Sequence, residues 1–405
     1  MAEILFEAGL MLAVLALAGT IAQRLNQSVI PFYVLSGMAM SPFVLGRLGI
    51  APVSGYAIEL QEYITLLAEL GIVFLLFFLG LEFSLDRLLE SRENIGKAGT
   101  LDLLVNLPAG VVVGLLLGWS LLEAFVLGGI VYISSSAVIT KSLIDLGWIA
   151  NDESNPMLGT LVYEDLFIAF YLAVLSAVLL GGGELSTIVV DVAVAMGFLL
   201  VLVSAVYFGT DYFDRFLNVD SEEMFVLRAV AITVFVAGFA LAIGVSEAVA
   251  AFFIGMGFSG TDHLHNLERR LIPFRDIFAA VFFFWIGLRT DPGVFPAVAG
   301  IVALLVLVTT PTKVFTGFFA GRFYGLDDRR NVRVGLGMVT RGEFSLIIAA
   351  IAADSTLGGA VLTESIPAVA VGYVLFMSIL GTMLMQYSGT FERYVVDGRS
   401  RTATD

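Results

Sequence analysis

Long apolar stretches alternate with short polar loops along almost the whole chain, and this pattern predicts its architecture. A helix needs ~20 apolar residues to cross a bilayer, so we expect about thirteen membrane-spanning helices. Several stretches are short or contain glycine and proline, which is typical of transporter helices. The expected segments cover about residues 4–23, 28–46, 61–83, 98–118, 121–144, 157–180, 186–208, 224–243, 245–260, 275–289, 294–320, 333–353 and 365–387.

The predicted fold is therefore that of an all-α polytopic membrane protein. One transmembrane domain is expected over residues 1–390, with a short cytoplasmic tail over 391–405. The first apolar stretch has no basic region before it and no evident cleavage site. We therefore expect it to be a retained helix rather than a signal peptide.

Basic residues are distributed unevenly between alternate loops. The loops after odd-numbered segments and the tail together hold fifteen, whereas the loops after even-numbered segments hold only Arg47 and Arg289. Cytoplasmic loops of membrane proteins carry an excess of Lys and Arg. The sequence therefore predicts an N-terminus outside the cell and a C-terminus in the cytoplasm, which also supports an odd number of helices.

The composition excludes a soluble enzyme and several kinds of site. The chain is 59% hydrophobic and 14% charged, whereas soluble domains are ~45–50% apolar and ~25% charged. It has no cysteine, so disulfides, thiol chemistry and Cys-ligated metals are excluded. Its two histidines, His263 and His265, share one polar loop that does not suggest a metal site. We expect no cofactor and no nucleic-acid partner.

The charge balance is strongly acidic. The formal net charge is −15, with 36 acids against 21 bases. The only lysines are Lys97, Lys141 and Lys313. Dense carboxylates with few lysines suit a high-salt cytoplasm, where strong screening lowers their mutual repulsion. We hold this halophile-like composition as a hypothesis about the protein's environment.

Two adjacent acids, Glu164 and Asp165, interrupt the apolar stretch over about residues 157–180. Carboxylates near the middle of a membrane are expensive, and they indicate a functional site by default. The alternative is a structural ion pair with a neighbouring helix. Since consecutive residues on a helix point about 100° apart, the two acids cannot face one ion equally.

Polar groups also interrupt two other expected helices. Ser134, Ser135 and Ser136 are consecutive in segment 121–144, where their hydroxyls compete for backbone hydrogen bonds and favour a broken helix. Freed carbonyls and hydroxyls can coordinate a dehydrated cation, although serines also pack small faces between helices. Lys313 lies inside segment 294–320, where it must find a carboxylate unless it snorkels to the cytoplasmic end.

Short motifs are spread along nearly the whole chain. They read Leu67-Ala68-Glu69-Leu70-Gly71, Gly80-Leu81-Glu82-Phe83, Ser134-Ser135-Ser136-Ala137-Val138, Pro273-Phe274-Arg275-Asp276 and Gly342-Glu343-Phe344. In content and order they resemble the motifs of the Kef-type branch of monovalent cation:proton antiporters. Ala250 departs from the family pattern, because it stands where the family usually has the first glycine of its GAF-x-AG motif.

The resemblance implies a sodium/proton antiporter fold of inverted repeats, with two crossed discontinuous helices at segments 121–144 and 333–353. It also implies that Asp165 binds the monovalent cation and the proton in turn. The position before it is Asp, Asn or Gln in the family, and Glu164 departs from all three. We expect Asp165 to coordinate the ion, Glu164 to pair or co-ligate, and Lys313 to pair with one of them.

Other residues are expected to support the site without carrying the proton. Arg341 and Glu343 should offset the partial charges of the half-helix ends or pair with each other, and they are not expected to be ion ligands. Glu247 is a third candidate intramembrane acid, or else it complements the dipole at a helix start. The supporting set is Lys313, Ser134, Ser135, Ser136, Thr340, Arg341, Glu343 and Glu247.

The predicted function is secondary antiport of a monovalent cation against protons by alternating access, in the plasma membrane. The motifs of segment 61–83 favour potassium, whereas the Glu-Asp pair leans toward sodium exchangers, and potassium is preferred over sodium. No ATP-binding Gly-x-x-x-x-Gly-Lys motif occurs, so an ion gradient would drive transport. The alternatives are a gated cation channel with Glu164, Asp165 and Glu247 as its selectivity cluster, or an ion or pH sensor.

The resemblance also bears on partners. A homodimer is the family's habit, and a role in pH homeostasis follows from the predicted exchange. Many Kef-type members carry a cytoplasmic nucleotide-binding domain after the last helix, and this chain ends too soon for one. It is therefore unregulated in that way, truncated, or served by a separate cytoplasmic regulatory subunit.

Overall fold

The computed structural model describes residues 2–25, 27–48, 57–82, 92–148, 151–180, 221–243 and 247–391, with parts of 193–219. Throughout these ranges the chain forms helices and loops, with no strand. Its α-helices are α1 (Ala2–Arg24), α2 (Val29–Met40), α3 (Glu62–Glu82), α5 (Arg92–Leu116), α6 (Leu121–Tyr132), α7 (Ser136–Asp145), α8 (Ser154–Leu180), α10 (Glu222–Ala242), α11 (Glu247–Ser259), α12 (Leu264–Arg289), α13 (Phe295–Phe323), α14 (Asp328–Gly337), α15 (Glu343–Ala353) and α16 (Ile366–Gln386). Short 3-10 turns cover Gly46–Leu48 and Pro292–Val294, and a π-helical turn over Val361–Ser365 leads into α16.

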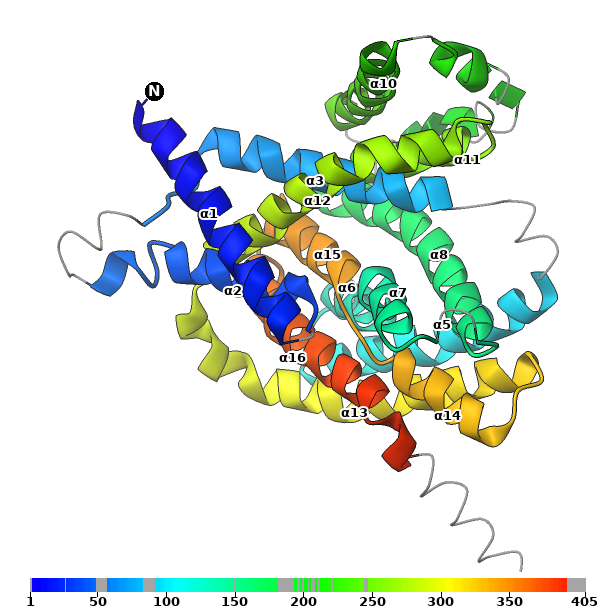
Figure 1. Ribbon diagram of the computed structural model, residues 1–405. Coiled ribbons are helices and arrows are strands. Elements are labelled where there is room, and N and C mark those ends of the chain that lie inside the picture. The colour runs from blue at the N-terminus through cyan, green and yellow to red at the C-terminus, as the bar shows by residue number, and fades with distance from the viewer. Residues whose placement is uncertain are drawn as a thin grey trace, which may run out of the picture.

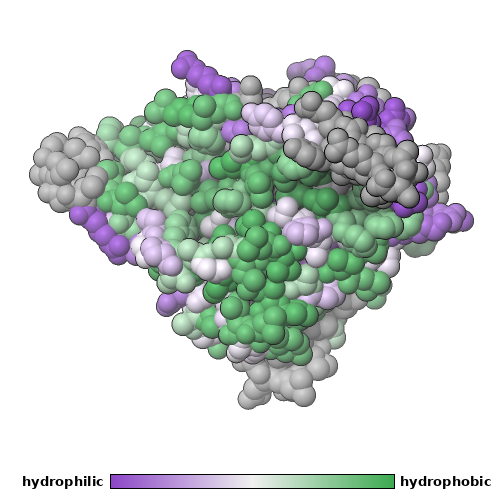
Figure 2. Space-filling view, turned by 90° about the horizontal axis from the view of Figure 1, so that it is seen from below, coloured by the Kyte–Doolittle hydropathy of each residue, from purple (hydrophilic) through white to green (hydrophobic). Residues whose placement is uncertain are grey.

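The expected all-α membrane fold is confirmed. Among the described residues, eight helices are long and apolar enough to cross a membrane, and α2, α6, α11 and α15 are shorter apolar helices. Large apolar side chains such as Leu104 on α5, Phe235 on α10 and Leu307 on α13 are exposed, as lipid-facing residues would be. Figure 2 shows apolar residues over much of one face, with hydrophilic residues gathered at its margins.

Several helix boundaries differ from the expected ones, among them the start of α5 at Arg92 rather than near residue 98. Helix α2 ends at Met40 rather than near residue 46, because Ser41 precedes Pro42 and a residue before proline avoids the helical conformation. Helix α12 begins at Leu264 rather than near residue 275, since its first turns are polar and give no hydropathy signal. Most of the expected segment 186–208, the motif residue Phe83 and nearly all of the tail lie outside the described residues.

The helices form two groups, which we call the scaffold and the core. In the scaffold, α3 packs against α11 and α12, and α2 packs against α12. In the core, α5 packs against α6, α8 and α13, and α13 packs against α14. Figure 1 shows α10 and α11 at one edge of the molecule and α13, α14 and α16 at the opposite edge, with α6, α7 and α15 between them.

Glycines hold the scaffold helices unusually close together. A Cβ atom on Gly80 of α3 would overlap the carbonyl oxygen of Phe252, and the facing Gly255 of α11 has the same relation to α3. Gly37 of α2 and Gly287 of α12 meet in the same way. Small residues let membrane helices approach until their backbones touch, so these two pairs fix the scaffold as a tightly packed unit.

Two helices are interrupted inside the core, as the sequence predicts. Residues 133–135 separate α6 from α7, and residues 338–342 separate α14 from α15. The interruptions cross, since the amide of Ser135 donates to the carbonyl oxygen of Thr340 at 3.3 Å. This crossing places free backbone groups and polar side chains deep in the bundle, next to α8 and α13.

Candidate functional site

Glu164 on α8 is fully buried and accepts hydrogen bonds from the first interruption. The backbone N–H of Ser134 donates to its Oε2 at 2.6 Å, and the Ser134 hydroxyl donates to its Oε1 at 3.1 Å. Backbone groups released where a helix breaks need partners, because buried unpaired groups are costly. Glu164 therefore stabilises the broken conformation of α6 and α7.

Lys313 on α13 is also fully buried and contacts two carboxylates. Its Nζ lies 2.8 Å from Oε1 of Glu164 and 2.7 Å from Oδ2 of Asp102. The ring of Tyr132 lies 5.3 Å from the same nitrogen, which adds a cation–π contact. Lys313 therefore pairs with Glu164, one of the two acids expected as its partner, and does not snorkel to the cytoplasmic end.

Asp102 also belongs to this cluster, although it was not among the site residues predicted from the sequence. It lies on α5, 1% exposed. Its Oδ1 accepts from the Thr316 hydroxyl at 2.6 Å and from the Asn106 side chain at 2.9 Å. A signal was present, because Asp102 and Asn106 lie four residues apart in the expected segment 98–118 and so share one helix face.

Asp165 faces a different partner from its neighbour Glu164. It is 5% exposed, and the Ser136 hydroxyl donates toward its two carboxylate oxygens, at 3.2 Å from Oδ1 and 3.0 Å from Oδ2. Ser136 is the first residue of α7, so Asp165 lies at the positive end of a half-helix. The two acids thus point into separate surroundings, as their offset of about 100° on a helix requires.

The second interruption is held by Glu343 and Arg341. The Ser135 hydroxyl donates to Oε2 of Glu343 at 2.7 Å, which ties the two interruptions together. Arg341 is fully buried, and its guanidinium donates to backbone carbonyls. This offsets the negative ends of the broken helices, one of the two roles expected for it. The carbonyls that accept from Arg341 belong to Val131, Met338, Val339 and Thr340.

Two buried hydroxyls beside the interruptions have no hydrogen-bond partner among the described residues. They are Oγ1 of Thr340 and the phenolic oxygen of Tyr132. Buried hydroxyls of this kind call for a water or an ion as partner. The oxygens near the crossing are carboxylate, hydroxyl and carbonyl oxygens, which suit hard cations rather than soft transition metals.

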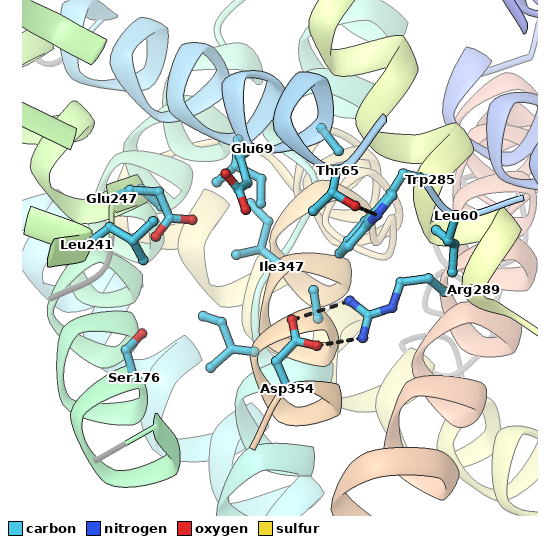
Figure 3. Close-up of a pocket in the computed structure, with 15 residues that line it drawn as sticks. Leu60, Thr65, Glu69, Ser176, Leu241, Glu247, Trp285, Arg289, Ile347 and Asp354 are labelled. Carbon is cyan, nitrogen blue, oxygen red and sulfur yellow. Dashed lines mark hydrogen bonds and ion pairs between the residues drawn. The ribbon is translucent and has the colours of Figure 1, made fainter. Parts of the chain in front are cut away.

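Glu247 is not brought together with Glu164 and Asp165. It is the first residue of α11 and lines a separate cavity, together with Ser176 (Figure 3). Ser176 lies eleven residues beyond Asp165 on the continuous helix α8, or about 16 Å along its axis at 1.5 Å per residue. The described residues therefore do not form the three-acid cluster that a channel was expected to use.

Comparisons with known proteins agree with this architecture. The family model for the transmembrane sodium/hydrogen exchangers matches residues 10–386. The K(+)/H(+) antiporter subunit KhtU of Bacillus subtilis is 35% identical, over 96% of this chain and 94% of that protein. The ammonium/H(+) antiporter subunit AmhT of Alkalihalophilus pseudofirmus is 28% identical, over 98% of this chain and 97% of that protein.

The fold is also that of a solved structure. The sodium proton antiporter MjNhaP1 from Methanocaldococcus jannaschii at pH 8 superposes with a TM-score of 0.70. The match covers 96% of this chain and 98% of that one at 15% sequence identity. At this identity the likeness is one of fold.

Proposed function

This chain belongs to the sodium/hydrogen exchanger family, and we propose that it exchanges a monovalent cation for a proton at Asp165. The main support for this proposal is that the two adjacent acids, Glu164 and Asp165, have different partners. Glu164 is engaged by Lys313 and by the backbone of the first interruption. Asp165 lies at the start of a half-helix, where the Ser136 hydroxyl donates toward both of its carboxylate oxygens, and we propose that a proton and a cation compete for these oxygens.

The surrounding residues provide ligands and balance charge. In this proposal Ser136 shares the ion with Asp165, and the oxygens released at the two interruptions complete its coordination. Lys313 lies within hydrogen-bond distance of both Asp102 and Glu164, so these three side chains form one buried charged cluster beside the ion site. A proton on Asp165 removes the charge that attracts the cation, and a bound cation disfavours the proton. Loading one therefore releases the other.

We propose that access alternates by movement of the core against the scaffold. The glycine contacts of α2, α3, α11 and α12 make the scaffold a rigid support. The core holds both interrupted helices together with α8 and α13, so the whole ion site would move as one unit. An ion gradient would drive this movement, and the transported ions are substrates rather than cofactors.

Potassium is the proposed cation, with sodium next. The motifs of segment 61–83 and the name of the relative KhtU favour potassium. The name of AmhT adds ammonium, an ion of similar size and charge, to the cations worth testing. We place the protein in the plasma membrane, with the N-terminus outside and the tail over 391–405 in the cytoplasm, where it would serve pH homeostasis.

We further propose a homodimer and a separate cytoplasmic regulatory subunit. The second idea is supported by the word subunit in the names of both relatives. Such a partner would meet the cytoplasmic face of the transmembrane domain over residues 1–390. Co-purification of the chain with the product of a neighbouring reading frame would test it.

Proton movement in proteoliposomes tests the proposed exchange. Liposomes loaded with a pH dye and holding an imposed proton gradient receive potassium, sodium, lithium or ammonium in turn. The parent should move protons when its cation is added, Asp165→Asn should not, and the exposed-acid control Glu93→Gln should behave as the parent. Cation movement without protons would establish a channel instead, and full activity in Asp165→Asn would mean that the site lies elsewhere.

A further inference from the structure

The cavity lined by Glu247 and Ser176 lies between the scaffold and the core, away from the ion site. Its volume is about 670 Å³, within the range of small-ligand sites. Helices α3, α8, α10, α11, α12 and α15 supply its walls (Figure 3). It lies where α3 and α11 begin and where α8, α12 and α15 end, which is the extracellular end in the proposed orientation.

Acidic side chains dominate the polar lining of this cavity. Glu69 of α3, Glu247 of α11 and Asp354 at the end of α15 all line it. Arg289 of α12 is the one basic residue among its described lining residues, and it pairs with Asp354, with Nη2 2.5 Å from Oδ1. Three carboxyl groups thus face one guanidinium. A cleft lined by an excess of one sign of charge between apolar walls concentrates ions of the opposite sign.

Ser176 gives an independent indication of a ligand. It is 1% exposed, and its hydroxyl has no hydrogen-bond partner among the described residues. Figure 3 shows this hydroxyl directed into the cavity, toward the space between Glu247 and Asp354. A buried hydroxyl without a partner is costly. A water molecule of a hydrated cation in the cavity would satisfy it.

The cavity and the ion site lie along one interface. Eleven residues, three helical turns, separate Asp165 from Ser176 on α8, so both lie on one face, about 16 Å apart along the axis. Glu343 and Asp354 at the two ends of α15 have the same spacing. Buried apolar side chains such as Leu172 lie between the two levels. The cavity is thus aligned with the ion site, about three turns of α8 away from it.

We propose that this cavity is an outer loading site, which holds a monovalent cation with part of its water shell on the way between the exterior and Asp165. The proposal rests on the proposed exchange. The acids do not converge, because no group of three acidic or histidine side chains among the described residues is placed to hold one metal ion. A cation here therefore keeps its water and is bound through it.

The chain contains no cysteine, so one introduced thiol reports on this cavity alone. Ser176→Cys in intact cells is treated with membrane-impermeant thiosulfonates, one cationic and one anionic. The reference is Leu121→Cys, 71% exposed at the start of α6 and outside the cavity. After the rates are normalised to those at Leu121→Cys, the cationic reagent should react with Ser176→Cys about 10-fold faster than the anionic reagent, or more. Equal rates for the two reagents would overturn the proposal.

Charge removal tests which residues create the preference. The double substitution of Glu69→Gln and Glu247→Gln should lower the ratio of the cationic to the anionic labelling rate at Ser176→Cys to that of the reference. Asp291→Asn, an acid on the same face outside the cavity, should leave the ratio unchanged. A ratio that survives loss of both glutamates would contradict the proposal. If Ser176→Cys does not fold, Leu241→Cys at the cavity wall takes its place.

Cation protection separates this site from Asp165. Potassium or sodium, compared with choline at equal ionic strength, should slow labelling of Ser176→Cys. The slowing should persist when Asp165→Asn is added, because the two sites are distinct. Protection that is absent, or that vanishes with Asp165→Asn, would overturn the loading site. Failure of the proposed exchange would appear instead in the flux assay and would leave the labelling pattern intact.

Discussion

Lys313 balances two carboxylates in a part of the molecule that water does not reach. Asp102, Glu164 and Lys313 are each at most 1% exposed. Removing one partner of a buried ion pair leaves an uncompensated charge, which typically costs about 3–5 kcal/mol. By contrast Lys97 pairs with Glu93 at 2.6 Å on the exposed surface, where solvent screening makes an ion pair contribute far less to stability. Although the two lysine contacts are similar in length, they should therefore differ greatly in what they contribute to the free energy of unfolding.

We expect Lys313→Met to lower the free energy of unfolding by about 3–5 kcal/mol, and Lys97→Met to change it far less, because its pair is exposed and screened. Thermal unfolding in detergent, followed by tryptophan fluorescence, measures both. Adding Glu164→Gln to Lys313→Met should restore part of the loss, because one uncompensated carboxylate is then removed. Equal shifts of the melting temperature for the two lysine variants would contradict this account of the cluster.

The sequence predicted some of these residue contacts and not others. Lys313 in an apolar stretch has few possible partners, so its pairing with the acids of α8 could be foreseen. Asp102 could not be assigned in the same way, because a single acid near a predicted helix end also suits the membrane surface. Which of the two adjacent acids faces Lys313 depends on the rotation of α8, and helix rotation is set by packing.

Between helices, close glycine contacts keep the scaffold tightly packed and leave no space for an added methyl group. A methyl group on Gly255 would overlap the carbonyl oxygen of Phe77, so α3 and α11 would have to move apart. Gly300 in α13 has open space around its Cβ position. Replacing glycine by alanine in a helix with such space is worth roughly 0.5–1 kcal/mol in favour of the helix.

Gly255→Ala and Gly300→Ala are therefore expected to act in opposite directions. The first should lower the melting temperature because it forces two backbones apart, and the second should leave it unchanged or raise it. The same fluorescence melt compares the two single-methyl additions directly. A stable Gly255→Ala protein with normal transport would show that the α3–α11 contact is less tight than the structure indicates.

Hydropathy predicted most helices well, and its errors have physical causes. It located α1, α3 and α8 to within a few residues, but it missed the polar first turns of α12, because Arg269 and Arg270 carry no apolar signal. The interruption at residues 133–135 was foreseen from three serines, whose hydroxyls compete with the helix. The interruption at 338–342 was foreseen only through a family motif. Its crossing with the first is a tertiary contact that no local pattern encodes.

For the molecule as a whole, the distribution of arginine and lysine predicts orientation in the membrane. Leu25 follows α1 and should face the cytoplasm, whereas Leu121 at the start of α6 should face the exterior; both are exposed, at 58% and 71%. In intact cells, an impermeant thiol reagent should label Leu121→Cys and should label Leu25→Cys only after permeabilisation. The reverse labelling pattern would show that the topology is inverted and that the cavity lined by Ser176 lies on the cytoplasmic side.

The central claim is that a cation and a proton compete for the oxygens of Asp165. Proton release on cation binding tests it without any assumption about transport. Purified protein in weakly buffered detergent solution with a pH indicator is titrated with potassium, sodium or ammonium. Competition at Asp165 predicts proton release that saturates with the cation and approaches about one proton per site, and no release from Asp165→Asn. Cation binding by the parent without proton release, or unchanged release from Asp165→Asn, would contradict it.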